Sequence, residues 1–292
     1  MEIVAQRVFN TLYMYLDIAF LILFCGALLI KKHYLTFLFA IAGGILYMIV
    51  DYGIFHLLLH TRSIEGGNLF AVLLWMSMSY GITNFAFLWL WFKRDEHLIE
   101  WTLLIWAWWL CAPMLAQTFG QGFPVITIQR TTGAYHGYMA IILFLSYGAA
   151  IVYNLFQKNV AERFPLRRLL AGGILAQLAW EIALLLGGIR SAGIESVFDK
   201  IMTLAVNSLL ETNLGAVPLF CIYVFITQRR NERLQPRQTI SFRARMRELA
   251  ARSPAAEGVS DEKRSPSDAS GSAADNAPCA SLDERRVEQK GQ

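Results

Sequence analysis

The sequence lacks the short motifs of the common enzyme classes. It contains no GxSxG nucleophile turn, no HExxH zinc motif, no Walker loop and no GxGxxG fingerprint. No long apolar run carries a lysine suited to a Schiff base, because Lys200 stands at the end of its run. The four cysteines, at positions 25, 111, 221 and 279, have no metal-binding spacing. These absences argue against serine hydrolases, zincins, P-loop proteins and Rossmann dehydrogenases.

Charge is also scarce. Only 16% of the residues are charged and 55% are hydrophobic, whereas a soluble domain carries about 25% charge. Apolar runs of about 20 residues recur along the first 228 positions, and each is long enough to cross a bilayer. The sequence therefore predicts an all-α polytopic membrane protein, a bundle of seven transmembrane helices. The predicted spans are roughly 9–30, 34–60, 69–92, 98–118, 133–156, 168–189 and 202–227.

Positive residues in the connecting segments predict the orientation. Ten of them fall in one set of segments and five in the opposite set, and the richer set is expected in the cytoplasm. The N-terminus is then outside and the C-terminus cytoplasmic, in a bacterial inner membrane or an endomembrane. The ten are Lys31, Lys32, Lys93, Arg94, Lys158, Arg163, Arg167, Arg168, Arg229 and Arg230, and the five are Arg7, Arg62, Arg130, Arg190 and Lys200.

Two regions differ in composition. Residues 1–234 form the predicted transmembrane domain, and residues 235–292 are rich in Ser, Ala, Pro and charge. The second region is predicted to be a disordered cytoplasmic tail. The stretch 239–252 has a second reading, as a short basic helix on the anionic inner leaflet. The net charge of +4 follows from the predicted topology, so membrane lipids and no nucleic acid are the expected partners.

Four acids interrupt the predicted spans at similar depths. Asp17, Asp51, Glu181 and Glu211 each lie eight or nine residues below the predicted outer end, which is about 11–14 Å along a helix. Carboxylates inside a membrane are costly and usually functional, so this level predicts a polar pocket that opens outward.

Other polar side chains share helix faces with these acids. Gln177 lies one turn before Glu181, and Asn207 lies one turn before Glu211. Tyr80 and Asn84 form a similar stripe on the third span. For Asn84, Gln177 and Asn207, hydrogen bonding between helices is an alternative to a role in the pocket.

Two further patterns leave alternatives open. His56, His60 and His136 could supply a metal site, but each also fits an interfacial histidine, and we expect neither a metal nor another cofactor. The pentapeptide AGGIL occurs at 42–46 and at 171–175, and an acid follows within six residues each time. This match is compatible with a parallel repeat of three spans, joined by the fourth span, as in some small-solute transporters.

Two segments carry a resemblance to a known family. KKHYLTFLFAIAGGILYMIVDYGIF at 31–55 and LLETNLGAVPLFCIYVFITQRR at 209–230 resemble the integral-membrane terpene cyclases of fungal meroterpenoid and indole-diterpene pathways. The resemblance implies seven spans and catalytic acids at Asp51 and Glu211. The family has a Glu in an Asn-x-x-Trp-Glu run in its second span, where this chain has MIVD. Its nearest equivalent here is LAWE, which ends at Glu181.

The resemblance and the acids together predict an isomerase or cyclase for a lipid-soluble isoprenoid. A neutral carboxylic acid, Asp51 or Glu211, would protonate an epoxide or alkene, and its partner would hold the counter-charge. Glu181, Tyr47, Tyr80 and Trp180 would orient the substrate or shield the cation. The alternatives are a proton- or cation-coupled transporter of a small solute, a metal-dependent lipid hydrolase using His56 and His136, and a non-catalytic sensor or scaffold.

Overall fold

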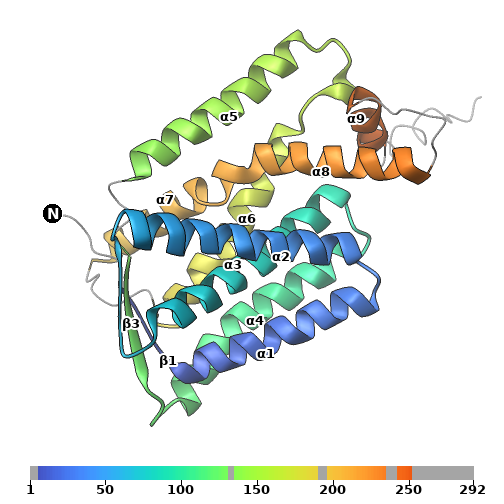
Figure 1. The fold of residues 1–292 in the computed structure, drawn as a ribbon. Helices are drawn as coiled ribbons and strands as arrows, with labels where there is room; N and C mark the ends of the chain where they lie inside the picture. Colours follow the sequence, from blue (N-terminus) through green and yellow to red (C-terminus); the bar gives the residue numbers. More distant parts are fainter. Residues whose placement is uncertain (1–5, 131–134, 190–195, 235–241, 252–292) are drawn as a thin grey trace, which may run out of the picture. The chain divides into compact units, whose positions relative to one another are not determined.

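The computed structural model describes residues 6–130, 135–189, 196–234 and 242–251. The chain is mostly helical, and seven of its described helices are long and apolar enough to cross a membrane (Figure 1). They are Thr11–Ile30, Tyr34–Leu58, Leu69–Lys93, Leu98–Phe119, His136–Phe156, Val160–Leu186 and Val197–Gln228. Each predicted span overlaps one of these helices. The apolar runs are compatible with a multi-pass membrane protein.

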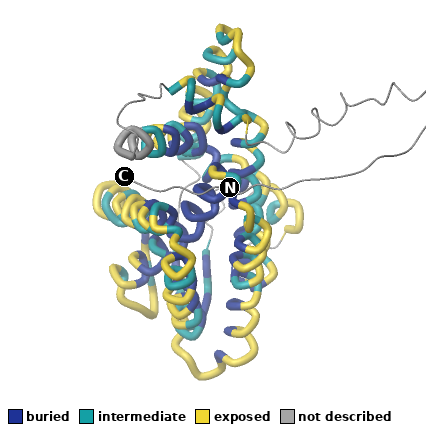
Figure 2. Tube along the Cα trace, turned by 90° about the vertical axis from the view of Figure 1, so that its right-hand side faces the viewer, coloured by how far each residue is buried: buried dark blue, intermediate teal, exposed yellow. Residues whose placement is uncertain are grey.

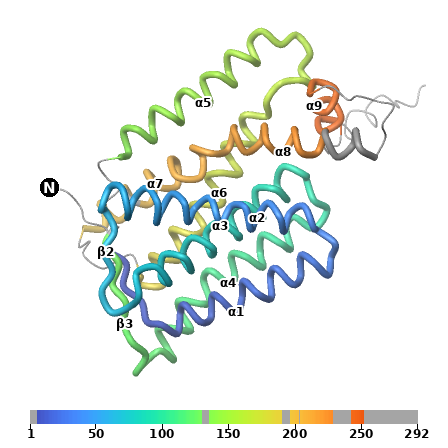
Figure 3. The backbone as a smooth tube through the Cα atoms, viewed as in Figure 1, coloured from blue at the N-terminus to red at the C-terminus, as the bar shows by residue number. Residues whose placement is uncertain are grey.

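The secondary structure of these seven segments is less regular than expected. Four of them are single helices: α1 (Thr11–Ile30), α3 (Leu69–Lys93), α4 (Leu98–Phe119) and α5 (His136–Phe156). The second combines α2 (Tyr34–Met48) with a π-helix, η1 (Ile49–Leu58), and the sixth combines a short 3-10 turn, η3 (Val160–Glu162), with α6 (Leu166–Leu186). The seventh is divided into α7 (Val197–Leu210) and α8 (Asn213–Leu234) (Figure 3).

A small antiparallel sheet covers one end of the bundle, and the prediction of an all-α fold missed it. Its strands are β1 (Gln6–Asn10), β2 (Arg62–Glu65) and β3 (Val125–Arg130), in the order β1-β3-β2. They come from the segments before α1, between η1 and α3, and between α4 and α5. The sheet is tied to α6 by a hydrogen bond of 3.1 Å from the Val8 N–H to the Ile189 carbonyl.

Glycines bring α2 and α3 into close contact. A Cβ at Gly81 of α3 would lie 2.2 Å from the Cα of Gly44, and a Cβ at Gly43 would meet the Phe85 ring. The second AGGIL copy also packs against neighbours, since Gly172 meets Trp91 of α3 and Gly173 meets Asn213 of α8. Small residues allow helices in membranes to approach closely, so both copies have a packing role.

We expect Gly81→Ala to destabilise the protein by about 1–3 kcal/mol, because the new methyl group would overlap the backbone of α2. Gly148→Ala in α5 is the matched control, since a Cβ there meets nothing within 4 Å. The control should be neutral or stabilise the protein by about 0.4–1 kcal/mol, through the smaller entropy of its unfolded chain. Thermal unfolding in detergent measures both effects, and equal stability of the two variants would contradict this packing.

Burial differs strongly between the helices. α3 is buried along most of its length, whereas Ala150 is the only described residue of α5 that is buried. Figure 2 shows the exposed positions along the outer sides of the helices and the buried ones where helices pack together. The central position of α3 brings its polar stripe among the other helices, and α5 remains a lightly packed flank.

The segment 235–292, predicted to be a disordered tail, contains a helix that packs against the bundle. This helix, α9 (Phe242–Ala251), buries Met246 and Leu249, and its Phe242 ring lies 6.3 Å from that of Phe164. Arg247 of α9 donates to the buried carboxylate of Glu162, with an Nε to Oε1 distance of 2.7 Å. Residues 242–251 therefore belong to the same compact unit as the bundle, and residues 252–292 of the predicted tail lie outside the described residues.

Candidate functional site

The acids of α6 and α7 meet at one glutamine. The side-chain amide of Gln177 donates to Glu211 Oε2 at 2.7 Å and to Glu181 Oε1 at 3.3 Å. Gln177 and Glu181 are 1% and 2% exposed, and Glu211 is half-buried. The i, i+4 spacing of Gln177 and Glu181 predicted their common face, and the structure adds Glu211 to the same cluster.

This acid pair, Glu181 and Glu211 with Gln177 between them, lies at the break between α7 and α8. Glu211 is the C-cap residue of α7, and its backbone N–H donates to the Asn207 carbonyl at 3.0 Å. Thr212 donates its hydroxyl to Gln177 Oε1 at 2.9 Å, which satisfies the other side of the amide. Gln177 therefore binds the side chains of both Glu211 and Thr212, the two residues between α7 and α8.

Buried polar groups continue the cluster on neighbouring helices. Asn213, the first residue of α8, accepts a hydrogen bond from the Tyr147 hydroxyl of α5 at 3.2 Å. Asn207 of α7 is buried beside the same break. The polar layer around the acid pair therefore draws on α5, α6, α7 and α8.

Asn84 of α3 is buried at a related level. α3 and α6 run antiparallel, with Tyr80 against Trp180 and Trp91 against Gly172, so Asn84 lies level with Gln177 along the bundle. Among the described residues, neither the oxygen nor the nitrogen of the Asn84 amide has a hydrogen-bond partner. An unpaired buried amide is costly, which marks this position as more than helix packing.

Asp51 belongs to a separate cluster under the sheet. It lies in the π-helix η1 and accepts a hydrogen bond from the Nε of Arg62, at the start of β2, at 2.7 Å. Each of the two residues is 4% exposed, and the Arg62 guanidinium also covers the Phe55 ring, 4.4 Å from its centre. π-helices are rare and often lie at functional sites. The ion pair with Arg62 ties η1 to β2, which fits a structural role for Asp51.

Asp17 has its own partner on α3. Its Oδ2 accepts a hydrogen bond of 2.8 Å from the indole nitrogen of Trp75, and the carboxylate is buried. The four acids that were predicted to form one layer therefore have three different partners. Asp17 binds Trp75, Asp51 binds Arg62, and Glu181 and Glu211 bind Gln177. Glu211 follows the 14 residues of α7 and lies level with Gln177. It is therefore about one helical turn further from the sheet than Glu181.

A row of aromatic rings connects the two acidic clusters. Tyr47 of α2 lies one turn before Asp51, and its ring centre is 6.2 Å from that of Tyr80 of α3. Tyr80 in turn packs edge-on against Trp180 of α6 at 4.5 Å, and Trp180 packs against Trp109 of α4 at 5.0 Å. Tyr47, Tyr80 and Trp180, predicted to contact the substrate, are thus neighbours.

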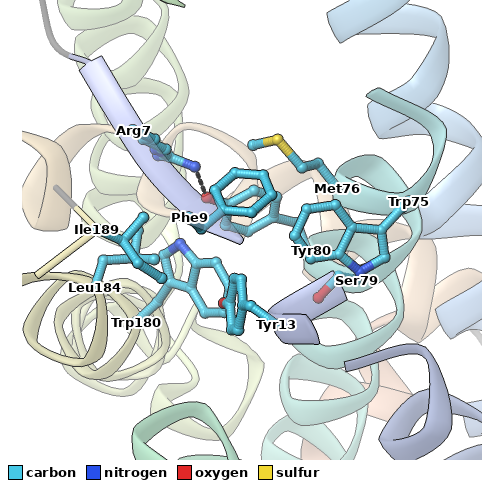
Figure 4. Close-up of a pocket in the computed structure, with 10 residues that line it drawn as sticks. All are labelled: Arg7, Phe9, Tyr13, Trp75, Met76, Ser79, Tyr80, Trp180, Leu184 and Ile189. Atoms are coloured by element: carbon cyan, nitrogen blue, oxygen red, sulfur yellow. Dashed lines mark hydrogen bonds between the residues drawn. The ribbon is translucent and has the colours of Figure 1, made fainter. Parts of the chain in front are cut away.

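A small cavity lies between this row and β1 (Figure 4). Arg7 of β1 points toward α3 there and donates a hydrogen bond to the Tyr80 hydroxyl. The cavity has a volume of about 10 Å³, close to the space that one water molecule needs. It is lined by Arg7, Phe9, Tyr13, Trp75, Met76, Ser79, Tyr80, Trp180, Leu184 and Ile189.

Three other cavities in the described part of the chain have volumes of about 50, 210 and 240 Å³. Asp51, Glu181 and Glu211 line none of these four cavities. The apolar groove of about 210 Å³ between α4 and α6 is lined by α6 residues such as Leu178 and Ile182, on the opposite helix face from Gln177. A binding site of several hundred Å³ beside the acids therefore requires the helices to move apart.

The alternative of a metal site at His56, His60 and His136 finds no support among the described residues. Within them, no group of three His, Cys, Asp or Glu side chains could hold a metal ion. His56 packs against the Tyr52 ring at 5.3 Å, and His60, two residues after η1, has a left-handed backbone, φ 51°. His136 begins α5.

The sequence reasoning missed the roles of Arg7 and Arg62, which it counted as exposed charges. Both are on the inward face of the sheet, in register with Phe9, Ile126 and Ile128 on that face, and each is at most 5% exposed. The available signal was the alternation of QRVFN and VITIQR, which is typical of strands with one buried face.

Comparison of the chain with models of protein families, with curated proteins and with solved structures finds no match.

Proposed function

We propose that this chain is an integral-membrane isomerase or cyclase that acts on a lipid-soluble isoprenoid by general acid catalysis. The observation that supports it best is the acid pair, in which Glu181 and Glu211 accept hydrogen bonds from the same Gln177 nitrogen. The shared donor brings the two carboxyl groups close together on α6 and at the end of α7. General acid catalysis on an epoxide or alkene would use one of them in its protonated form, with the other beside it as the counter-charge.

The roles of the acids follow from their partners. Glu211 is the proton donor because it is the half-buried member of the pair, and Glu181 with Gln177 holds the remaining charge. Asp51 is held as a carboxylate by Arg62 and acts as a fixed charge that keeps η1 and β2 together. Trp180, next to Glu181, presents an aromatic ring that can stabilise a developing cation.

Access for the substrate is proposed from the side of α5. This helix buries only Ala150 among its described residues and contacts the polar layer through the Tyr147 hydroxyl. Little apolar packing has to be lost if α5 moves, and a lipid-soluble substrate arrives from the bilayer itself. Glu181 and Glu211 line none of the four described cavities, so binding of a substrate beside them requires this opening.

The proposed topology has seven spans, with the sheet outside and α9 in the cytoplasm. Two of the five positive residues assigned to the outer side, Arg7 and Arg62, are buried with partners inside the protein. The positive charge left in contact with water or headgroups is therefore more one-sided than the sequence count of ten against five.

The test is conversion of an epoxidised prenyl substrate by membranes that contain the full chain, without added metal. We expect product that depends on the protein, followed by chromatography with mass detection. Absence of turnover with epoxidised prenyl chains of several lengths, by protein that is folded in the membrane, would overturn the proposed activity.

The second candidate is a proton-coupled transporter of a small solute, favoured by the helix break at Glu211 and Thr212. A three-span repeat would pair the seventh span with the third, but the break between α7 and α8 has no counterpart in α3, which is continuous. Proteoliposomes with an imposed pH gradient distinguish the candidates. Solute-dependent proton flux that is absent in Glu211→Gln would favour the transporter.

A further inference from the structure

A positively charged cavity lies at the end of the bundle where α3 ends, α6 begins and α9 packs. Its volume is about 50 Å³, several times the space that one water molecule needs. Three arginines line it, together with apolar side chains that include Met246 and Leu249 of α9. The full lining is Phe92, Arg94, Arg163, Pro165, Arg168, Leu169, Phe220, Met246, Leu249 and Ala250.

Two of the three arginines, Arg163 and Arg168, donate hydrogen bonds to backbone carbonyls. Arg168 donates from Nη2 to the Trp91 carbonyl at 2.6 Å and covers the Trp91 ring at 5.0 Å. Arg163 donates from Nε to the Gln157 carbonyl at 3.0 Å. Arg94 has a left-handed backbone, φ 55°, and its buried Nη1 has no hydrogen-bond partner among the described residues. Burial lowers the pKa of Arg94, so its charge lacks the solvation that water would supply.

No ion pair within the described residues joins Arg94, Arg163 or Arg168 to a carboxylate. The nearby acids have other partners. Glu162 binds Arg243 and Arg247 of α9, and Asp95 binds Lys93. Arg94 and Arg168 are close enough to repel each other, so an anion between them would relieve that repulsion.

The start of α6 adds to the positive potential. This 21-residue helix begins beside the cavity, and its cap, Pro165, supplies no side-chain hydrogen bond to the first turn. The first N–H groups of a helix and its dipole favour an anion at that end. The unpaired Arg94 nitrogen and the helix start are separate observations that point to the same ligand charge.

We infer that this cavity binds a phosphate-bearing anion, either the headgroup of an anionic phospholipid or a free phosphate. Arginine forks match phosphate oxygens well, and three of them with a helix start form a typical set of donors. Met246, Leu249 and Ala250 of α9 line the same cavity, so the bound anion also stabilises the packing of α9 against the bundle. This inference does not depend on the proposed catalytic activity.

The experiment compares two probes on the purified full chain in detergent. Native mass spectrometry measures binding of dioleoyl phosphatidate, with dioleoyl phosphatidylcholine as the lipid control, and calorimetry measures binding of inorganic phosphate. We expect Arg94→Gln and Arg163→Gln each to weaken phosphatidate binding at least about tenfold, because each removes a charged hydrogen bond. Arg167→Gln is the matched control, since this neighbouring arginine is exposed and does not line the cavity.

The outcomes separate the two sources and can overturn the site. If the arginine variants lose phosphatidate binding and the unaltered chain does not bind inorganic phosphate, the ligand is a lipid headgroup. If the variants lose binding of both probes, the site accepts phosphate from either source. Equal losses in Arg167→Gln, or no binding of either probe to the unaltered chain, would refute the site. Because Arg163 is exposed, Arg163→Gln is expected to fold, and its phosphatidate binding tests the site if Arg94→Gln does not fold.

Discussion

Replacement of Arg62 by Gln is expected to destabilise the protein by about 3–5 kcal/mol, because it removes the guanidinium that pairs with a buried carboxylate. Asp51→Asn should cost a similar amount, since it leaves the Arg62 charge buried under the sheet. Equilibrium unfolding in mixed micelles, followed by tryptophan fluorescence, measures both effects.

The double variant Asp51→Asn with Arg62→Gln is the decisive comparison. Both charges are then absent, so its loss of stability should be well below the sum of the two single losses. Additive losses would mean that the pair contributes nothing as a pair. Arg167→Gln, which removes an exposed arginine, should change stability by less than about 0.5 kcal/mol.

The largest expected effect on activity comes from Glu211→Gln. The variant keeps the shape and the contact with Gln177 but cannot donate the proton of a carboxylic acid. Turnover should fall by about 10²-fold or more, the usual contribution of a general acid. Glu181→Gln should also lower turnover, because the counter-charge proposed beside Glu211 is then absent.

Two controls separate chemistry from folding. Glu100→Gln, at an exposed acid in the first turn of α4, should leave turnover unchanged. Asp51→Asn should lower turnover only in proportion to the folded fraction, if Asp51 is a fixed charge. Full turnover by correctly folded Glu211→Gln would remove the acid role from Glu211, and a folded but inactive Asp51→Asn would return that role to Asp51.

The helices were predictable because their signal is local. Runs such as TLYMYLDIAFLILFCGALLI at 11–30 are apolar over a bilayer thickness whatever they pack against. The i, i+4 relation of Gln177 and Glu181 also follows from the helix alone. The strands were missed because β1 and β2 are only five and four residues long, and their partner β3 is distant in sequence. Helix α9 falls within 239–252, which had a second reading as a short helix, but its packing was not predictable because it depends on burying Met246 and Leu249 against the bundle.

By itself, the sequence determined that seven apolar helices long enough to span a bilayer would form, and that carboxylates would lie within several of them. Backbone hydrogen bonding in an apolar run leaves few other choices. Only the tertiary structure decided how those carboxylates are partnered. Asp51 lies beside Arg62 because β2 folds over η1, and Glu181 meets Glu211 through Gln177 because α7 ends where it contacts α6. Such partners are set by packing between distant segments, on which helical periodicity carries no information.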